Sequence, residues 1–398
     1  MARADAVEIP ANVGRAIASA FCTGLIGIGL ARFAYTPLLP AIINAHWFPA
    51  SAAAYLGAAN LAGYLAGAVL GRPIASRYSV VGLLHVMMLT ATAAFFACSV
   101  PVSFLWFFVW RFAAGFAGGA MMVLAAPTVL AHVPASRRGL AGGLIFMGVG
   151  AGMVLSGTLI PFLLQKGLHE AWLGLGVLSL TLTIIAWKGW PDELAPKAHP
   201  GAHVHPPRSG ALKVLYAEYS LNAAGWVPHM IFFVDFIARG LGQGVEVGAV
   251  FWVAFGLSAT IGPIFAGYLG DRIGFGVALR VAFIMEIAAI AIPALNVTNR
   301  PALLLSSIIV GAFLTGTVTL VLGRIHELLP HQPTKQKASW SVATVAFALA
   351  QAISAYGFSF VFAHTNGDYQ LLFMMGAAAM VIALVLDLAW WLHSGTDD

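Results

Sequence analysis

The sequence has little charge and almost no cysteine. Only 9% of its 398 residues are charged and 60% are hydrophobic, whereas a soluble domain has about 25% charged and about 45–50% apolar residues. The scarcity of charge excludes an ordinary soluble enzyme, and the hydrophobicity excludes a disordered chain. Cys22 and Cys98, the only cysteines, both lie in apolar runs and exclude a disulfide-stapled secreted domain. Lipid is therefore the expected solvent of this chain.

Long apolar runs account for most of the sequence. A bilayer core about 30 Å thick needs about 20 apolar residues per helix, and runs of this length without period-two alternation indicate helices, not strands. The first run is too long for a signal peptide and has no clear cleavage site after it, so we expect it to be retained. The twelve candidate spans are 14–43, 52–71, 80–99, 103–131, 140–164, 170–188, 211–238, 246–269, 276–295, 302–323, 338–363 and 369–392.

Basic residues are distributed unequally between the two ends of these spans. With the N-terminus in the cytoplasm, fifteen of the 20 Lys and Arg residues fall on the cytoplasmic side, and only Lys166, Arg239 and Arg300 fall outside. The positive-inside rule then places both termini in the cytoplasm, and we expect a multi-pass protein of the cytoplasmic (inner) membrane. The net charge of +5 is mostly this cytoplasmic fringe, so we expect no nucleic-acid partner. The remaining two arginines, Arg32 and Arg111, lie within spans.

A polar, proline-rich stretch at residues 189–210 divides six spans from six. We therefore expect an N-terminal six-helix bundle over 1–188, a cytoplasmic linker over 189–210 and a C-terminal six-helix bundle over 211–398. Equal halves about a linker indicate a duplication.

Related loops support the duplication. GAVLGRPIASR follows the second span and GYLGDRIGFG follows the eighth, and Arg72 in the first loop corresponds to Arg272 in the second. The second copy has the pattern Gly-x-x-x-Asp-Arg-x-Gly, whereas Gly71 replaces the aspartate of the first copy. The residues of the second copy are Gly267, Asp271, Arg272 and Gly274.

With this repeated motif the sequence resembles the major facilitator superfamily of secondary transporters. A further signature of that superfamily, Arg-x-x-x-Gly-x-x-Gly on the fourth span, fits Arg111, Gly115 and Gly118. The segments GIGLARFAYTPLLPAI at 27–42 and VPHMIFFVDFIARGLG at 227–242 resemble the YbfB/YjiJ-type permeases. The fifth span lacks the Gly-Pro pair of the antiporter signature, which argues against a drug antiporter.

The resemblance implies an all-α integral membrane protein with twelve transmembrane helices in two pseudo-symmetric six-helix bundles. The bundles would rock about a central cavity lined by the first, fourth, seventh and tenth helices. The loop motif, with Arg72, would take part in gating: Asp271 could pair with a basic group or a helix end when the cavity faces outward. The alternative is that the loop is a solvated turn.

Charges inside a span cost at least about 2.5–3.5 kcal/mol on insertion scales and are candidates for function. Arg32 lies near the middle of the first span and shares a helix face with Tyr35 and Thr36. Because a guanidinium stays charged and can grip a carboxylate with two parallel hydrogen bonds, we predict an anion-binding site at these residues. The alternative for Arg32 is an ion pair, or a bond to carbonyls of a broken helix near Pro37 and Pro40.

Arg111 on the fourth span is a second candidate for binding or attracting the substrate. The superfamily signature also implies a part in proton coupling, and a packing charge that ties the fourth helix to its neighbours is the alternative. Trp226 on the seventh span could stack on the substrate or serve packing. Glu286 on the ninth span is expected to form a local pair and not to contact substrate.

A polar stripe runs along the seventh span. Glu218, Asn222 and His229 are spaced so that they share one helix face, and Pro228 would break the helix beside His229. We predict that Asn222 and His229 contact the substrate, with Trp226. Glu218 or His229 would carry the coupled proton, because a buried carboxylate or an imidazole can bind a proton reversibly. A hydrogen-bonded core histidine is the alternative for His229.

Three histidines in the linker, His199, His203 and His205, could bind a metal, but the stretch is short of acids and has no cysteine. We expect no metal and no cofactor. A membrane enzyme would need clustered ligands such as H-E-x-x-H, which the spans lack, so we do not expect an enzyme. The expected partners are a small solute, protons and the bilayer, and a monomer is the expected state.

The sequence therefore predicts a secondary active transporter. It would move a small, carboxylate-bearing organic solute by proton-coupled alternating access. The alternative is a proton-coupled efflux antiporter for hydrophobic or cationic compounds. That function would require the acids Glu218 and Glu286 to dominate the cavity and ion pairs to neutralise the arginines.

Overall fold

The computed structural model describes residues 11–130, 132–133, 138–191, 209–295 and 298–394. This part of the chain has no strand and contains twelve helical segments that are long and apolar enough to cross a membrane. They coincide with the twelve predicted spans to within several residues at each end. Most of the predicted linker, with its three histidines, lies outside the described residues.

The first span is interrupted, and the next five are continuous helices. The first consists of α1 (Ala11–Gly24), the π-helix η1 (Leu25–Leu30) and α2 (Tyr35–Asn44). The others are α3 (Ala50–Ala75), α4 (Val80–Ala97), α5 (Phe104–Leu130), α6 (Arg138–Leu164) and α7 (Leu168–Ala186).

The second half repeats this pattern, with an interrupted helix followed by five continuous ones. The seventh span consists of α8 (Gly210–Gly225), α9 (Val227–Ile231), α10 (Phe233–Asp235) and the π-helix η3 (Phe236–Gly240). The others are α11 (Val245–Ile273), α12 (Phe275–Ala294), α13 (Arg300–Leu328), α14 (Pro333–His364) and α15 (Tyr369–Ser394).

Local sequence signals set several helix boundaries. The Ser79 side chain caps α4 by accepting from the backbone N–H of Gly82 (3.0 Å), and Asn299 caps α13 by accepting from Ala302 (2.9 Å). Gly274 separates α11 from α12 at φ +82°, a left-handed conformation that glycine adopts without a steric cost.

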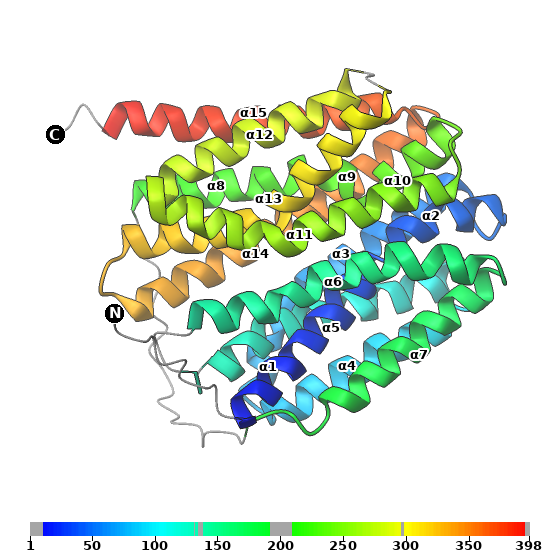
Figure 1. Ribbon diagram of the computed structural model, residues 1–398, viewed down its shortest axis with the longest axis horizontal. Coiled ribbons are helices and arrows are strands. Elements are labelled where there is room, and N and C mark those ends of the chain that lie inside the picture. The colour runs from blue at the N-terminus through cyan, green and yellow to red at the C-terminus, as the bar shows by residue number, and fades with distance from the viewer. Residues whose placement is uncertain (1–10, 131, 134–137, 192–208, 296–297, 395–398) are drawn as a thin grey trace, which may run out of the picture.

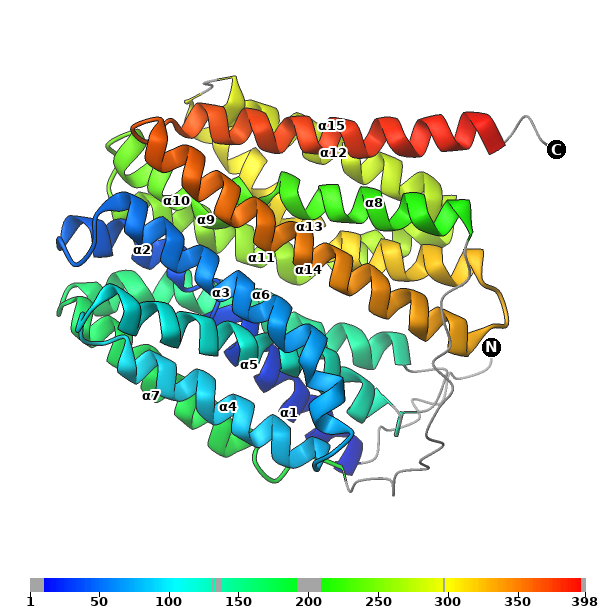
Figure 2. The ribbon, with the colours of Figure 1, turned by 180° about the vertical axis from the view of Figure 1, so that it is seen from behind.

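The two halves form two helix bundles that lie side by side (Figure 1). One contains α1–α7 and the other α8–α15, and we call them the first and second bundles. The view from behind shows the same division (Figure 2). The start of α1 and the end of α15 lie at the same end of the molecule, which we call the termini end, and α2 and α10 lie toward the opposite, far end.

Within each bundle, glycines allow one pair of helices to approach closely, and the two pairs are equivalent. A Cβ atom on Gly63 of α3 would lie 2.0 Å from the carbonyl oxygen of Phe112 on α5, and one on Gly115 would lie 1.8 Å from a carbonyl oxygen of α3. In the second bundle a Cβ atom on Gly262 of α11 would lie 1.9 Å from the carbonyl oxygen of Ala312 on α13. Backbone contact of this kind is how small residues pack membrane helices.

The bundles contact one another through four pairs of spans. α6 packs on α11, α3 packs on α14, and α2 packs on α9, α10 and α11. The hydroxyl of Thr36 on α2 donates a hydrogen bond to the carbonyl oxygen of Met230 on α9. The far halves of the first and seventh spans are thus joined directly.

Candidate functional site

Both interrupted spans are broken near their midpoints. In the first span, residues 31–34 separate η1 from α2. In the seventh, α8 ends at Gly225 and α9 begins at Val227, with Pro228 in its first turn. Proline has no N–H to continue the helical ladder, so the predicted break at Pro228 is confirmed. In lipid, carbonyls freed at such breaks need partners from neighbouring helices or a polar cavity.

Arg32 lies in the break of the first span, between the two bundles. Its side chain is buried, and its Nη2 atom lies 3.3 Å from the sulfur of Met230. The guanidinium carbon lies 5.1 Å from the ring centroid of Tyr64 and 5.8 Å from that of Trp226. Its Nε has no hydrogen-bond partner, and no carboxylate among the described residues pairs with it. Because a thioether is a weak acceptor, Arg32 is a buried cation without a counter-ion.

Arg111 has a different environment. Its Nη1 donates to the carbonyl oxygen of Ala31 (2.7 Å), and its guanidinium carbon lies 4.3 Å from the ring centroid of Tyr35. The amide of Asn60 also reaches the Ala31 carbonyl (3.4 Å). Arg111 thus satisfies a carbonyl freed at the break and fixes the segment that carries Arg32. This arrangement supports the packing role that the sequence left open.

Tyr35 and Thr36 direct their polar atoms to backbone carbonyls. The Tyr35 hydroxyl donates to a carbonyl oxygen of α3 (2.6 Å), and the Thr36 hydroxyl donates to that of Met230. Through these hydrogen bonds, the two side chains hold α2 in place next to Arg32. Neither hydroxyl has its proton free for a ligand in this arrangement.

The seventh span presents Trp226 and Met230 to Arg32. Trp226 is buried, its Nε1 has no hydrogen-bond partner, and its ring lies 5.8 Å from that of Phe347 on α14. Met230 was not singled out by sequence reasoning. Its position four residues after Trp226, on the same helix face, is the signal that could have found it.

The predicted polar stripe faces the core of the second bundle. Asn222 Nδ2 donates to Glu286 Oε2 on α12 (2.8 Å), and His229 Nε2 lies 2.8 Å from the Ser306 hydroxyl on α13. The structure therefore does not bring Asn222 or His229 together with Arg32. The polar stripe and the face that carries Trp226 lie next to each other on one helix, and only the latter faces the first bundle.

His229 is a buried histidine with one hydrogen bond. The Ser306 hydroxyl donates to the carbonyl oxygen of Ala289 (2.7 Å), so His229 Nε2 is the donor toward Ser306. Its ring stacks on Phe233 at a centroid distance of 4.7 Å, and Nδ1 has no partner. The imidazole is thus held in place with one ring nitrogen left as an acceptor.

Two carboxyl groups of the second bundle are buried without a cation. Glu218 is 3% exposed and Glu286 is 0% exposed. Neither forms an ion pair within the described residues, and Oε2 of Glu218 and Oε1 of Glu286 lack hydrogen-bond partners. Asp235, in contrast, accepts two hydrogen bonds from Arg239 (2.5 and 2.8 Å) at the far end. Unpaired acids thus lie in the middle of the bundle.

The loop motif lies on the surface at the termini end. Asp271, Arg272 and Arg72 are exposed, and Asp271 forms no ion pair with any described residue. The Arg272 guanidinium carbon lies 4.7 Å from the ring centroid of a tyrosine on its own helix. A Cβ atom on Gly267 would make ordinary contact with α13 at 3.6 Å, and Gly274 supplies the turn. The gating role of Asp271 stays a prediction.

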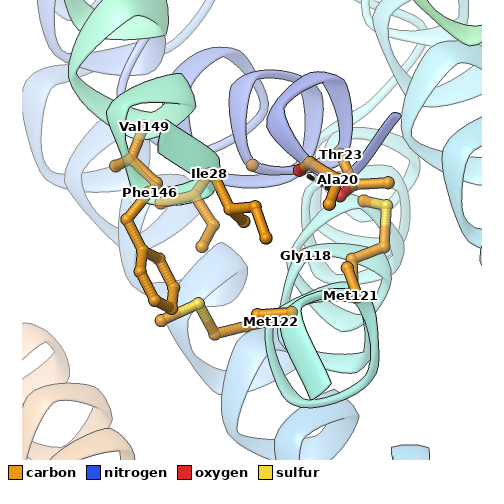
Figure 3. Close-up of a pocket in the computed structure, with 12 residues that line it drawn as sticks. Ala20, Thr23, Ile28, Gly118, Met121, Met122, Phe146 and Val149 are labelled. Carbon is orange, nitrogen blue, oxygen red and sulfur yellow. Dashed lines mark hydrogen bonds between the residues drawn. The ribbon is translucent and has the colours of Figure 1, made fainter. Parts of the chain in front are cut away.

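Two pockets lie elsewhere in the described part of the chain, and Arg32 lines neither of them. Figure 3 shows one between α1, α5 and α6, with the side chains of Met121, Met122 and Phe146 around it. Its volume of about 20 Å³ is close to that of one water molecule. A larger pocket of about 430 Å³ lies at the far end, where Ser51 of α3 faces Arg239 and other residues of the second bundle.

Two six-helix bundles that meet at interrupted first and seventh helices define a secondary transporter fold. Solved structures support this. The chain is similar to the D-xylose–proton symporter (TM-score 0.71, 14% identity, 94% of this chain and 97% of that one). It is also similar to the xylose transporter XylE from E. coli in a partially occluded inward-open conformation (TM-score 0.72, 13% identity, 94% and 98%). At such identities the likeness concerns the fold alone.

The family is identified by its sequence model. The model of the uncharacterised major facilitator transporter YbfB matches residues 24–388, which is most of the chain. The protein therefore belongs to this family of the major facilitator superfamily, as the motifs predicted. Family and fold identify a multi-pass membrane transporter and not an enzyme. None of the curated proteins matches the chain.

Proposed function

We propose that the protein is a proton-coupled transporter of a small organic anion, and that a carboxylate of the substrate binds Arg32. One observation carries this proposal: the Arg32 guanidinium is buried between the bundles with no acidic partner among the described residues. A buried charge without a partner is costly, so its retention favours a ligand that supplies the opposite charge.

The surroundings of Arg32 suit a carboxylate. Arg32 Nε lacks a partner and Nη2 has only the Met230 sulfur, so two donors on one edge of the guanidinium are available for a parallel pair of hydrogen bonds. The rings of Tyr64 and Trp226 stabilise the cation between transport events through cation–π contacts. A substrate carboxylate that displaced the Met230 sulfur would give the Arg32 guanidinium a strong acceptor in place of a weak one.

The other predicted residues take supporting parts in this proposal. Arg111 adds a second positive charge behind the break and holds Ala31. Tyr35 and Thr36 anchor α2, and Trp226 covers the site from the second bundle. Within the proposal, Asn222 and His229 do not touch the substrate at Arg32 and influence it through the seventh span. Glu218 takes part in proton transfer.

The alternative, efflux of a hydrophobic or cationic compound, has less support. It requires acids at the meeting point of the bundles and neutralised arginines. The acids Glu218 and Glu286 lie in the second bundle, and Arg32 has no carboxylate partner. The charge that faces the meeting point is therefore positive.

Location and gating complete the proposal. The excess of Lys and Arg at the termini end supports cytoplasmic termini in the inner membrane. The protein would work as a monomer. Breakage of contacts made by the loop motif with Asp271 would accompany opening toward the cytoplasm.

Transport by the purified protein in liposomes tests the function. Candidate carboxylates, neutral sugars and organic cations would be offered with and without an imposed pH gradient. We expect uptake of a carboxylate that rises when the gradient is imposed. Uptake of cations alone, or uptake indifferent to the gradient for every solute, would contradict the proposal.

Arg32 variants test the site. Arg32→Ala should weaken apparent affinity for the carboxylate by roughly tenfold to a hundredfold, because a hydrogen bond to a charged group contributes about 1.5–3 kcal/mol. Arg32→Lys should lie between, since it keeps the charge and loses the planar fork. Lys166→Ala, an exposed basic residue at the far end, is the matched control. An unchanged affinity in Arg32→Ala would exclude the assigned role.

A further inference from the structure

We infer that Glu286, held by Asn222 in the core of the second bundle, is the proton-binding group of this transporter, at a site separate from the anion site at Arg32. This inference deepens the proposed function and rests on it for the link to transport. The proton site itself rests on the contacts of Glu286.

The geometry around Glu286 distinguishes its two oxygens. Oε2 accepts a hydrogen bond from Asn222 Nδ2 (2.8 Å), while Oε1 has no partner, and the side chain is 0% exposed. We assign this arrangement to a neutral carboxylic acid, with the carbonyl oxygen at Oε2 and the proton on Oε1. A carboxylate enclosed in the same place would have one amide donor and no cation to offset its charge.

Asn222 is the group that could tolerate both forms. Its amide can donate to Oε2 whether the acid is neutral or charged, because an ionised carboxyl only accepts and a neutral one still has a carbonyl acceptor. Its Nδ2 also approaches the sulfur of Met380 (3.6 Å), so the amide has a second, weaker acceptor. Proton binding forms an O–H bond at Oε1, and release returns that proton to the path by which it came or to the opposite one.

No other charged group stands beside Glu286. The helices packed against α12 are α11, α13 and α15, and α8 reaches it through Asn222. None of their charged or titratable side chains forms an ion pair with Glu286 in the described residues. These side chains are Lys213, Tyr216, Glu218 and Tyr219 on α8, Glu246, Tyr268, Asp271 and Arg272 on α11, Arg280 on α12, Arg300, Arg324, His326 and Glu327 on α13, and Tyr369, Asp387 and His393 on α15.

Further polar groups lie between Glu286 and the termini end. Glu218 lies one helical turn before Asn222 on the same face of α8, within electrostatic reach of Arg280 and Asp387. These two form a half-buried ion pair between α12 and α15. Within this inference, a proton that enters from the termini end reaches Glu218 first and Glu286 next.

A second set of polar groups lies on the other side of Glu286. Ser306 donates to the carbonyl oxygen of Ala289, about one turn beyond Glu286 on α12, and His229 donates to Ser306. His229 Nδ1 is an unused acceptor. This pair extends the polar column toward the far end and supplies a route by which a proton could leave.

The seventh span connects the proton site to the anion site. Asn222 lies in the last turn of α8, and Trp226, one turn later, sits at the break and covers Arg32. When Glu286 loses its proton, the Asn222 amide is drawn to the charged carboxylate, and the end of α8 follows it. This movement would shift the Trp226 ring relative to the Arg32 guanidinium, although the two sites do not touch each other.

Infrared spectroscopy of the full-length protein in lipid tests the proton site without any substrate. The band to follow is the C=O stretch of a neutral carboxylic acid as pH is raised. We expect Glu286→Gln to abolish the largest titrating component of this band. Glu327→Gln, which removes an exposed acid, is the control and should leave the band unchanged. Full retention of the band in a folded Glu286→Gln protein would overturn the inference.

Asn222→Ala provides a test that keeps Glu286. Removal of the donor to Oε2 should shift the C=O stretch to higher frequency and leave its amplitude. An unshifted band would overturn the assignment of Asn222. This variant also decides the matter if Glu286→Gln does not fold.

Transport assays separate this inference from the proposed function. With a carboxylate that the protein exchanges, Glu286→Gln should retain exchange and lose pH-driven accumulation, whereas Arg32→Ala should weaken the apparent affinity measured by exchange and retain the infrared band. Retained accumulation in Glu286→Gln would overturn the inference alone. Absence of transport for every carboxylate would defeat the proposed function and leave the infrared result to stand for the proton site.

Discussion

The two bundles bury ionisable groups of opposite kind, bases in the first and acids in the second, without a counter-ion in the part of the chain that the structure describes. In the first, Arg32 and Arg111 lie inside the helices, and Glu170, exposed at the start of α7, is the only acid between residues 11 and 191. In the second, Glu218 and Glu286 lie inside the helices without a basic partner in the described residues. Arg32 and the two glutamates therefore lack an internal counter-ion among these residues, unlike Asp235, which pairs with Arg239.

The difference indicates two ligands of opposite charge. A buried group that lacks its counter-ion destabilises the fold, so such groups are expected where a ligand supplies the missing charge. The proposed ligand of Arg32 is an anion, and the proposed ligand of Glu286 is a proton. Because the cation faces the other bundle and the acids face their own bundle core, the two ligands do not compete for one site.

The largest effect is expected when Arg32 is given a carboxylate partner within the protein, which removes the difference between the bundles. Met230→Glu replaces the sulfur at 3.3 Å with an acid that pairs with the guanidinium. We expect apparent affinity for the anion to fall roughly a hundredfold, equivalent to about 2.8 kcal/mol. Counterflow in liposomes measures it. Met230→Gln, which adds no charge, is the control, and equal effects of both variants would exclude the charge argument.

Arg111→Met asks whether the second arginine is structural. It removes the 2.7 Å donor of the Ala31 carbonyl and leaves only the longer bond from Asn60 (3.4 Å), and loss of a partner by a buried polar group costs up to about 1–3 kcal/mol of stability. We expect a lower thermal midpoint in detergent. Arg111→Lys should recover part of the loss. If stability is unchanged while anion affinity falls, Arg111 is a substrate residue instead.

Glu218→Gln sharpens the assignment of the acids to the proton. With one proton per substrate, a pH difference of one unit sustains about tenfold accumulation, which this variant should reduce toward none. Exchange of labelled substrate should persist, since Glu218 does not face Arg32. The measurement is uptake with and without the gradient. Accumulation and exchange both at the original level would remove Glu218 from the proton path.

Trp226→Phe should have the smallest effect. It keeps an aromatic ring over Arg32 and removes the stronger indole contact, so affinity should weaken by roughly twofold to fivefold, in line with about 0.5–1 kcal/mol for a cation–π contact. Trp106→Phe, at an exposed tryptophan of α5, is the control. A loss as large as that of Met230→Glu would mean that Trp226 contacts the substrate directly.

The fold was largely predictable from the sequence. Twenty-residue apolar runs have one stable form in lipid, which is why the spans, the duplication and the break at Pro228 could be predicted. Arg32 was also identifiable, because charge inside a span is rare.

The face of the seventh span was not predictable. Helical periodicity shows that Asn222 and His229 share a face, but it does not show which neighbour that face meets. Polarity was a poor guide because the core of the second bundle is itself polar, with Glu286 and Ser306 meeting the stripe. The apolar residue Met230, which contacts Arg32, carried no chemical signal.

Met230 makes two contacts with the first span. Its sulfur lies against the Arg32 guanidinium, and its carbonyl oxygen accepts from Thr36. Separation of the far halves of the first and seventh spans therefore breaks the backbone contact and withdraws the sulfur in the same movement. Under the proposed function, opening of the far end and exposure of the guanidinium to an incoming anion would be one event, and the Met230 side chain would cover the empty site while that end is closed.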